Sequence, residues 1–171
     1  MQHRLLCAAL GLAALFAPVA AGSAQIDGWE AEPFDAGTGC YVARFVEKNL
    51  MVGFHYMTEK REFRIALSSE NWDALVADGD RQGKVELRLT TPGGLRTLST
   101  KEGYAMPLGG GTEAVAAIWY AGEGETVRSA LSTASAMTVT FDGDPVGTFP
   151  LQGASGAIDA LMACVADLGK S

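Results

Sequence analysis

Most of the chain after residue 40 alternates apolar and polar residues in short stretches. Polar or glycine-containing turns separate these stretches, which cover 41–45, 50–56, 63–67, 85–90, 95–100, 137–141 and 145–151. An alternation of period two with short turns is typical of antiparallel strands that bury one face. The segment 114–120 is apolar at nearly every position and therefore predicts a strand that is covered on both faces.

Two segments instead carry apolar residues at helical spacing. In 125–134 the spacing is met by Val127, Ala130, Leu131 and Ala134. Near the C-terminus a longer stripe contains Ile158, Leu161, Met162, Val165 and Leu168. We expect Ser155 to cap this second helix and Gly169 to end it. The pattern predicts an α+β fold: a largely antiparallel sheet of about seven or eight strands, covered by a C-terminal helix, with a second short helix.

Residues 1–24 have the layout of a secretory signal peptide. Arg4 precedes an uninterrupted apolar stretch from Leu5 to Ala17, and small residues follow Pro18. The apolar stretch is shorter than the roughly 20 residues that a membrane-spanning helix needs. We therefore expect export to the periplasm or beyond, with no integral membrane segment in the mature chain.

Removal of this segment would leave two of the three cysteines, Cys40 and Cys164. In an oxidising compartment two cysteines have one intramolecular pairing, so the sequence predicts a Cys40–Cys164 disulfide. Neither cysteine has a histidine or a second cysteine nearby, which disfavours a metal or catalytic role.

Residues 25–171 are expected to form a single globular domain, with 25–39 as an irregular lead-in. The full chain has 171 residues and a formal net charge of −7, and 48% of its residues are hydrophobic. A negative charge argues against binding nucleic acid, because that requires a basic surface. It also disfavours adhesion to an anionic membrane surface.

No catalytic constellation stands out along the sequence. His55 is the single histidine after residue 24, and no serine lies in a Gly-x-Ser-x-Gly setting, so His55 is expected to have a structural or surface role. Asp78, Asp80 and Gly83 resemble the start of a calcium loop, but position twelve is Leu89 where a glutamate is needed. We expect no catalytic residues, no metal site and no cofactor.

A possible binding surface is indicated by one aromatic residue and one basic cluster. Trp72 lies in a polar stretch, which makes it the best candidate for an exposed anchor, with packing against the core as the alternative. Lys60, Arg61 and Arg64 form the one local basic cluster that could attract an acidic partner.

The C-terminal stretch has a recognisable form. The segment from Phe149 through Gly153 to Ile158, continuing to Leu161 and Cys164, is a strand that ends in Phe-x-Leu-x-Gly, followed by a helix rich in small residues. It resembles the end of small exported alphaproteobacterial proteins of the invasion-associated locus B type, although this chain has a single cysteine pair where more would be expected. The resemblance implies a periplasmic or outer-surface protein that acts by binding rather than catalysis.

These observations together favour a monomeric, non-catalytic binding or accessory protein of the cell envelope, whose partner could be an envelope protein. One alternative is an inhibitor or chaperone-like partner of an envelope enzyme, which would present a loop such as 68–83 or 105–112. The other is a hydrolase that uses carboxylates brought together only by the fold.

Overall fold

A computed structural model describes residues 24–33, 38–47, 50–72, 75–108 and 115–168, and for 24–26, 108 and 115–121 it describes the backbone alone. The expected signal peptide lies outside the described residues except for Ala24. The elements are β1 (Ala24–Ile26), β2 (Trp29–Pro33), β3 (Gly39–Glu47), β4 (Leu50–Met57), β5 (Glu62–Ser69), β6 (Arg81–Thr91), β7 (Gly94–Leu108), β8 (Val115–Glu123), α1 (Gly124–Ser132), β9 (Ala136–Phe141), β10 (Asp144–Pro150) and α2 (Ala154–Leu168).

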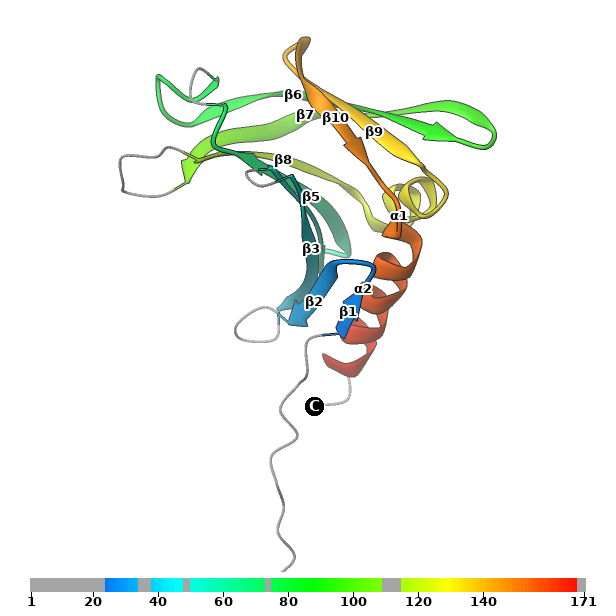
Figure 1. Ribbon diagram of the computed structural model, residues 1–171. Helices are drawn as coiled ribbons and strands as arrows, with labels where there is room; N and C mark the ends of the chain where they lie inside the picture. Colours follow the sequence, from blue (N-terminus) through cyan, green and yellow to red (C-terminus); the bar gives the residue numbers. More distant parts are fainter. Residues whose placement is uncertain (1–23, 34–37, 48–49, 73–74, 109–114, 169–171) are drawn as a thin grey trace, which may run out of the picture.

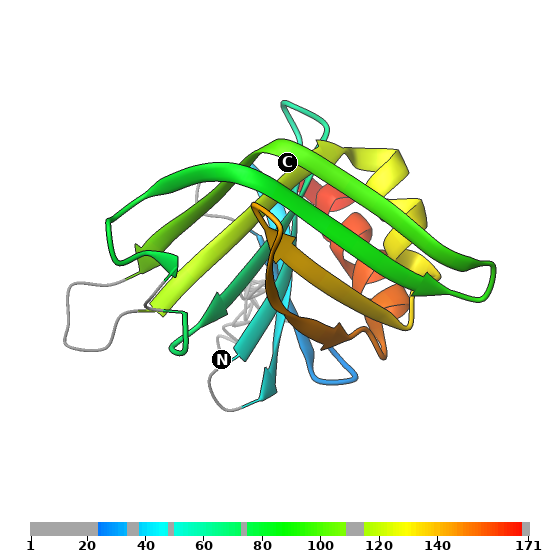
Figure 2. The ribbon, with the colours of Figure 1, turned by 90° about the horizontal axis from the view of Figure 1, so that it is seen from above.

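The strands form one antiparallel sheet in the order β1-β2-β3-β4-β5-β8-β7-β6-β9-β10. The first five follow the chain, whereas β8 rather than β6 pairs with β5. Figure 1 shows the sheet curving from β2 and β3 to β6 and β7, with the two helices on one side. Seen from above, the β6–β7 hairpin crosses the molecule and its turn projects beyond the body (Figure 2). The predicted class is confirmed in outline: a largely antiparallel sheet with two helices, one of them C-terminal.

The predicted strand count and the irregular lead-in are wrong for the same reason. Within 25–39, β1 and β2 form a hairpin that joins the edge of the sheet, which raises the number of strands to ten. Its turn is Asp27-Gly28, with φ angles of 49° and 82°. These positive angles suit a two-residue hairpin turn, for which Asp-Gly is a favoured pair. The predicted turn at Asp142-Gly143 has the same chemistry and joins β9 to β10.

One face of the sheet, here called the inner face, holds the core. Its fully buried side chains come from both halves of the sheet and include Val52, Phe54, Phe63, Leu87, Val139 and Phe149. They occupy alternate positions in their strands, as the period-two pattern predicts. Because the curved sheet turns this face inward, strands far apart in the sequence share a single core.

Helix α2 packs against β1–β4 and against α1, and its buried residues are Ala154, Ala157, Ile158 and Leu161. The helix begins at Ala154, so Ser155 lies inside its first turn instead of capping it. The predicted disulfide is confirmed: Cys40 of β3 is bonded to Cys164 of α2, with the two Cα atoms 6.2 Å apart. The disulfide therefore fixes the C-terminal helix to the inner face of the sheet.

Arg44 joins β3 to the segment that leads from β10 into α2. Its guanidinium donates to the carbonyl oxygens of Pro150 at 2.5 Å and Gln152 at 2.7 Å. The same guanidinium lies 4.8 Å from the ring centre of the buried Trp29, whose indole also donates to Gln152 O. These contacts bring β10 back toward β2 and β3. Among the described residues, none of the helices is long and apolar enough to span a bilayer.

Candidate functional site: the outer face of β3–β5

The structure does not bring the predicted binding residues together. Lys60 and Arg61 are exposed in the turn before β5, whereas Trp72 follows the other end of that strand. Eight strand residues separate the two ends by about 25 Å. Trp72 is half-buried and meets the core residue Phe149 edge-on, with ring centres 6.4 Å apart. Trp72 therefore takes the alternative role, packing against the core, and the basic cluster does not share a surface with it.

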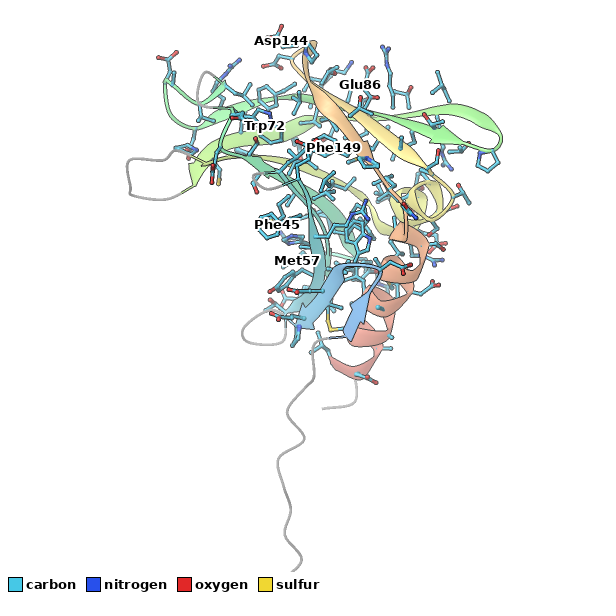
Figure 3. All side chains as sticks on the ribbon, viewed as in Figure 1. Phe45, Met57, Trp72, Glu86, Asp144 and Phe149 are labelled. Carbon is cyan, nitrogen blue, oxygen red and sulfur yellow. A yellow bond between two sulfur atoms is a disulfide. The ribbon has the colours of Figure 1, made fainter. Side chains whose placement is uncertain are left out.

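A different surface emerges from the register of β3, β4 and β5. On the face away from the core, residues that stand directly opposite one another form three rows across the strands. We call these residues the outer patch: Tyr41, His55 and Arg64 in the first row, Ala43, Gly53 and Ala66 in the second, and Phe45, Met51 and Ser68 in the third, with Met57 at the end of β4. In Figure 3, Phe45 and Met57 lie on the side of the sheet away from α2.

The outer patch combines apolar residues with Tyr41, His55, Arg64 and Ser68, and part of it is open to solvent, whereas Gly53, Ala66 and Ser68 are buried. Phe45 is 72% exposed, and Met51 and Met57 are half-buried. The middle row continues through the backbone of residue 119 in β8 to Tyr104 in β7, which is 45% exposed. Scattered exposed apolar residues are common, but a set of them on one sheet face is typical of an interaction surface.

His55 occupies the centre of the outer patch and is held neutral there. Burial, and after it the positive charge of Arg64, lower the pKa of its imidazole to about 4. The Tyr41 and His55 rings are 5.8 Å apart. A Cβ atom on Gly53 would lie 3.3 Å from His55 Nε2, so the imidazole lies against this glycine. His55 thus contributes to the surface as an uncharged ring at neutral pH.

Carboxylates border the outer patch. Glu30 and Glu32 of β2 and Glu62 of β5 face the same way as the patch, and Glu123 of β8 stands directly opposite Glu62. Glu32 accepts a hydrogen bond of 2.6 Å from Tyr41, and Glu62 forms an ion pair with Arg64. These four carboxylates and one guanidinium give the face a negative charge.

The facing pair Glu62 and Glu123 is the arrangement that the hydrolase alternative requires. Glu62, however, is bound to Arg64, and Glu123 accepts a hydrogen bond from Thr126 at the start of α1. Glu123 is also exposed. The contacts assign both groups to the charged border of the patch. Across the described ranges, no three His, Cys, Asp or Glu side chains are grouped so that they could hold a metal ion.

Reasoning from the sequence missed the outer patch, although it held a usable signal. A disulfide from Cys40 to the C-terminal helix requires Cys40 to face the core. With a period of two, Tyr41, Ala43 and Phe45 must then face the other side. Aromatic residues at these outward positions indicate a second face with apolar side chains, on which Phe45 is exposed.

Comparison with known proteins found no matching protein family, no matching curated protein and no matching solved structure.

Proposed function

We propose that this chain is an exported, non-catalytic binding or accessory protein of the cell envelope, and that it contacts its partner through the outer patch. The observation that carries the proposal is Phe45, a large apolar side chain that is 72% exposed on an apolar sheet face. Exposing such a side chain gains nothing for folding, whereas burying it against a partner would be favourable.

Export is supported by the signal-like N-terminal segment and by the disulfide between Cys40 and Cys164. Disulfides persist in oxidising compartments such as the periplasm and are rare in the cytosol. The resemblance of the segment from Phe149 to Cys164 to the invasion-associated locus B type points in the same direction. That resemblance and the periplasmic location belong to this proposal.

The alternative of an inhibitor or chaperone-like partner has one specific observation in its favour. Leu95 is 78% exposed next to the turn of the projecting β6–β7 hairpin (Figure 2). A projecting hairpin with an apolar side chain at its tip could insert into a cleft of another protein. Phe45 and Leu95 are about equally exposed, so the two proposals can be compared directly.

Site-specific photocrosslinking tests which surface is used. A photoreactive phenylalanine analogue is placed at position 45, 104, 95 or 97, and the full chain is crosslinked in the cells that export it. We expect positions 45 and 104 to give the same discrete adduct, and positions 95 and 97 to give none. An adduct from position 95 alone would favour the hairpin and the inhibitor alternative. Absence of any adduct from position 45 would contradict the outer patch as a binding surface.

A further inference from the structure

We infer that the outer patch binds a basic polypeptide segment that carries apolar side chains. This inference rests on the proposed function and specifies the chemistry of the partner. It is carried by two features that share one face of the sheet: an apolar surface on which Phe45 is exposed and Met51 and Met57 are half-buried, and a border in which carboxylates outnumber basic groups.

The strand residues of this face carry more acidic than basic groups. Their carboxylates are Glu30, Glu32, Glu62 and Glu123, and their basic group is Arg64. The turn that joins Met57 to Glu62 adds exposed Glu59, Lys60 and Arg61 at one end of the patch. Arg64 is already engaged by Glu62, whereas Glu32 and Glu123 accept hydrogen bonds from the uncharged hydroxyls of Tyr41 and Thr126. Glu30 and Glu123 are exposed, so lysine or arginine side chains could reach them from solvent. Opposite charges across an interface favour encounter with the matching partner and disfavour others.

The apolar part of the surface suits side chains rather than sugars or phosphates. Phe45, Met51 and Met57 offer no strong hydrogen-bonding group, so they gain most from contact with other apolar groups. Methionine side chains also adapt to irregular shapes, as on surfaces that bind varied peptides. The exposed part of this apolar surface is the end of β3 at Phe45, because the space above Gly53 is filled by the His55 imidazole.

Three other occupants fit this surface less well. An anionic membrane or a nucleic acid would be repelled by the same carboxylates. A second copy of this chain, docked patch to patch, would place two sets of carboxylates around one interface. His55 adds no positive charge to offset them, because its pKa of about 4 keeps it neutral at neutral pH.

Calorimetric titration with synthetic peptides tests the inference on the mature chain. The first peptide combines lysines with phenylalanine and leucine in a glycine–serine background. In the second, glutamates replace the lysines, and in the third, serines replace the apolar residues. We expect the first peptide to bind at least about tenfold more tightly than either of the others. We also expect its affinity to fall with added salt, because salt screens exposed charges.

Variants of the protein assign the binding to the patch. Phe45→Ser should weaken binding of the first peptide about tenfold or more, the loss typical of a central apolar anchor. Glu30→Gln with Glu123→Gln should weaken it about two- to fivefold, as expected for exposed charge pairs. Asp144→Asn is the matched control, because this exposed carboxylate lies at the tip of the β9–β10 hairpin, away from the patch (Figure 3). The control should bind like the unmodified chain.

The outcomes separate this inference from the proposed function. Equal binding of the lysine and glutamate peptides, both lost in Phe45→Ser, would keep the patch as a binding surface but overturn the basic partner. Binding of none of the peptides would also overturn it, while the crosslinking experiment would still decide the proposed function. A final experiment measures whether the protein is retained on vesicles of phosphatidylcholine, with and without phosphatidylglycerol. Retention of the protein on either vesicle through Phe45 would overturn the inference in favour of a lipid surface.

Discussion

The strands β3–β5 and the strands β6, β9 and β10 present similar inner faces and very different outer faces. On the inner side both sets contribute fully buried apolar residues, such as Phe54 and Leu87, to one core. On the outer side, β3–β5 show phenylalanine, methionine and tyrosine. The outer side of β6, β9 and β10 is lined instead by charged residues and threonines.

The polar outer face satisfies its side chains within the molecule. Glu86 lies 3.2 Å from Lys84 Nζ and 3.0 Å from Arg88 Nε, and the hydroxyls of Thr138 and Thr148 are 3.0 Å apart. Hydrogen bonds from Lys84 and then Arg88 lower the pKa of the Glu86 carboxyl. The charged and polar side chains of such a face pair with one another or with water, so the face needs no partner protein to cover it. The outer patch, in contrast, leaves Phe45 exposed. The two halves therefore contribute alike to the core but present different surfaces to a partner.

The largest expected effect comes from the disulfide, which ties α2 to the β3–β5 half alone. Replacing Cys40 or Cys164 by Ser should lower the free energy of unfolding by about 4 kcal/mol, because the bond closes a loop of 124 residues in the unfolded chain. Denaturant unfolding measures the change, and the double variant with Ala at both positions should match either single one. The rate of amide hydrogen exchange should increase first in β3 and α2, and only afterwards in β6 and β9. A loss below about 1 kcal/mol would contradict the expected contribution.

Paired truncations test whether the two inner faces are equivalent. Phe54→Ala in β4 and Leu87→Ala in β6 should each cost about 3 kcal/mol of unfolding free energy, because both side chains are fully buried and leave a cavity. Thermal or denaturant unfolding of the two variants measures the costs. If one costs less than half of the other, the halves do not share one cooperative core, and the comparison would have to be restated for two separately stable parts.

The sequence patterns predict the individual strands and helices well here, because residues close together in the sequence decide whether a segment forms a strand or a helix. Alternation identifies β3 to β7, β9 and β10 in outline, and the apolar segment 114–120 predicts β8. The stripe from Ile158 to Leu168 predicts α2, and elimination among the cysteines predicts the Cys40–Cys164 bond. The helix boundaries differ by one or two residues, as at Ser155, because capping depends on backbone angles that adjacent positions can also provide.

Strand order and the site depend on contacts between distant segments. The alternation in β5 says which residues share a face but not that β8 will be its neighbour. Likewise, the alternation around Tyr41 and Phe45 indicates an amphipathic strand, and it takes the predicted Cys40–Cys164 bond to indicate which face meets the core. The polar neighbours of Trp72 leave both an exposed anchor and packing against the core open, and Phe149, distant in the sequence, provides the packing partner.

Lowering the pH should reduce the free energy of unfolding through protonation of His55, which lies in the β3–β5 half. The pKa of this side chain is about 4 in the folded state and ordinarily 6.5, so the unfolded chain binds the proton more readily between these values. The stabilisation that comes from neutral His55 is fully present above about pH 6.5 and is lost as the pH falls through 4, by about 3 kcal/mol in total. Denaturant unfolding of the unmodified chain and of His55→Gln at several pH values measures this loss. The difference in unfolding free energy between the two proteins should shrink as the pH falls from about 6.5 to 4. A constant difference would contradict the shifted pKa.

The smallest effect on stability is expected from exchanging outward residues between the two halves. Phe45→Thr and Thr97→Phe replace exposed side chains on the outer patch and on the polar half, so each should change the unfolding free energy by less than about 0.5 kcal/mol. Denaturant unfolding checks this. A loss above about 1 kcal/mol in Phe45→Thr would instead assign Phe45 to the fold.

Binding should respond in the opposite way to stability. Phe45→Thr should lose the lysine-rich apolar peptide, whereas the double variant Phe45→Thr with Thr97→Phe should not regain it. Position 97 stands directly opposite Arg88, so a new aromatic ring there would have a basic neighbour, whereas the residue opposite Phe45 is the apolar Met51. Calorimetric titration of the three proteins distinguishes the possibilities. Recovery of binding in the double variant would mean that any exposed aromatic ring suffices, and the difference between the two outer faces would then reduce to one side chain.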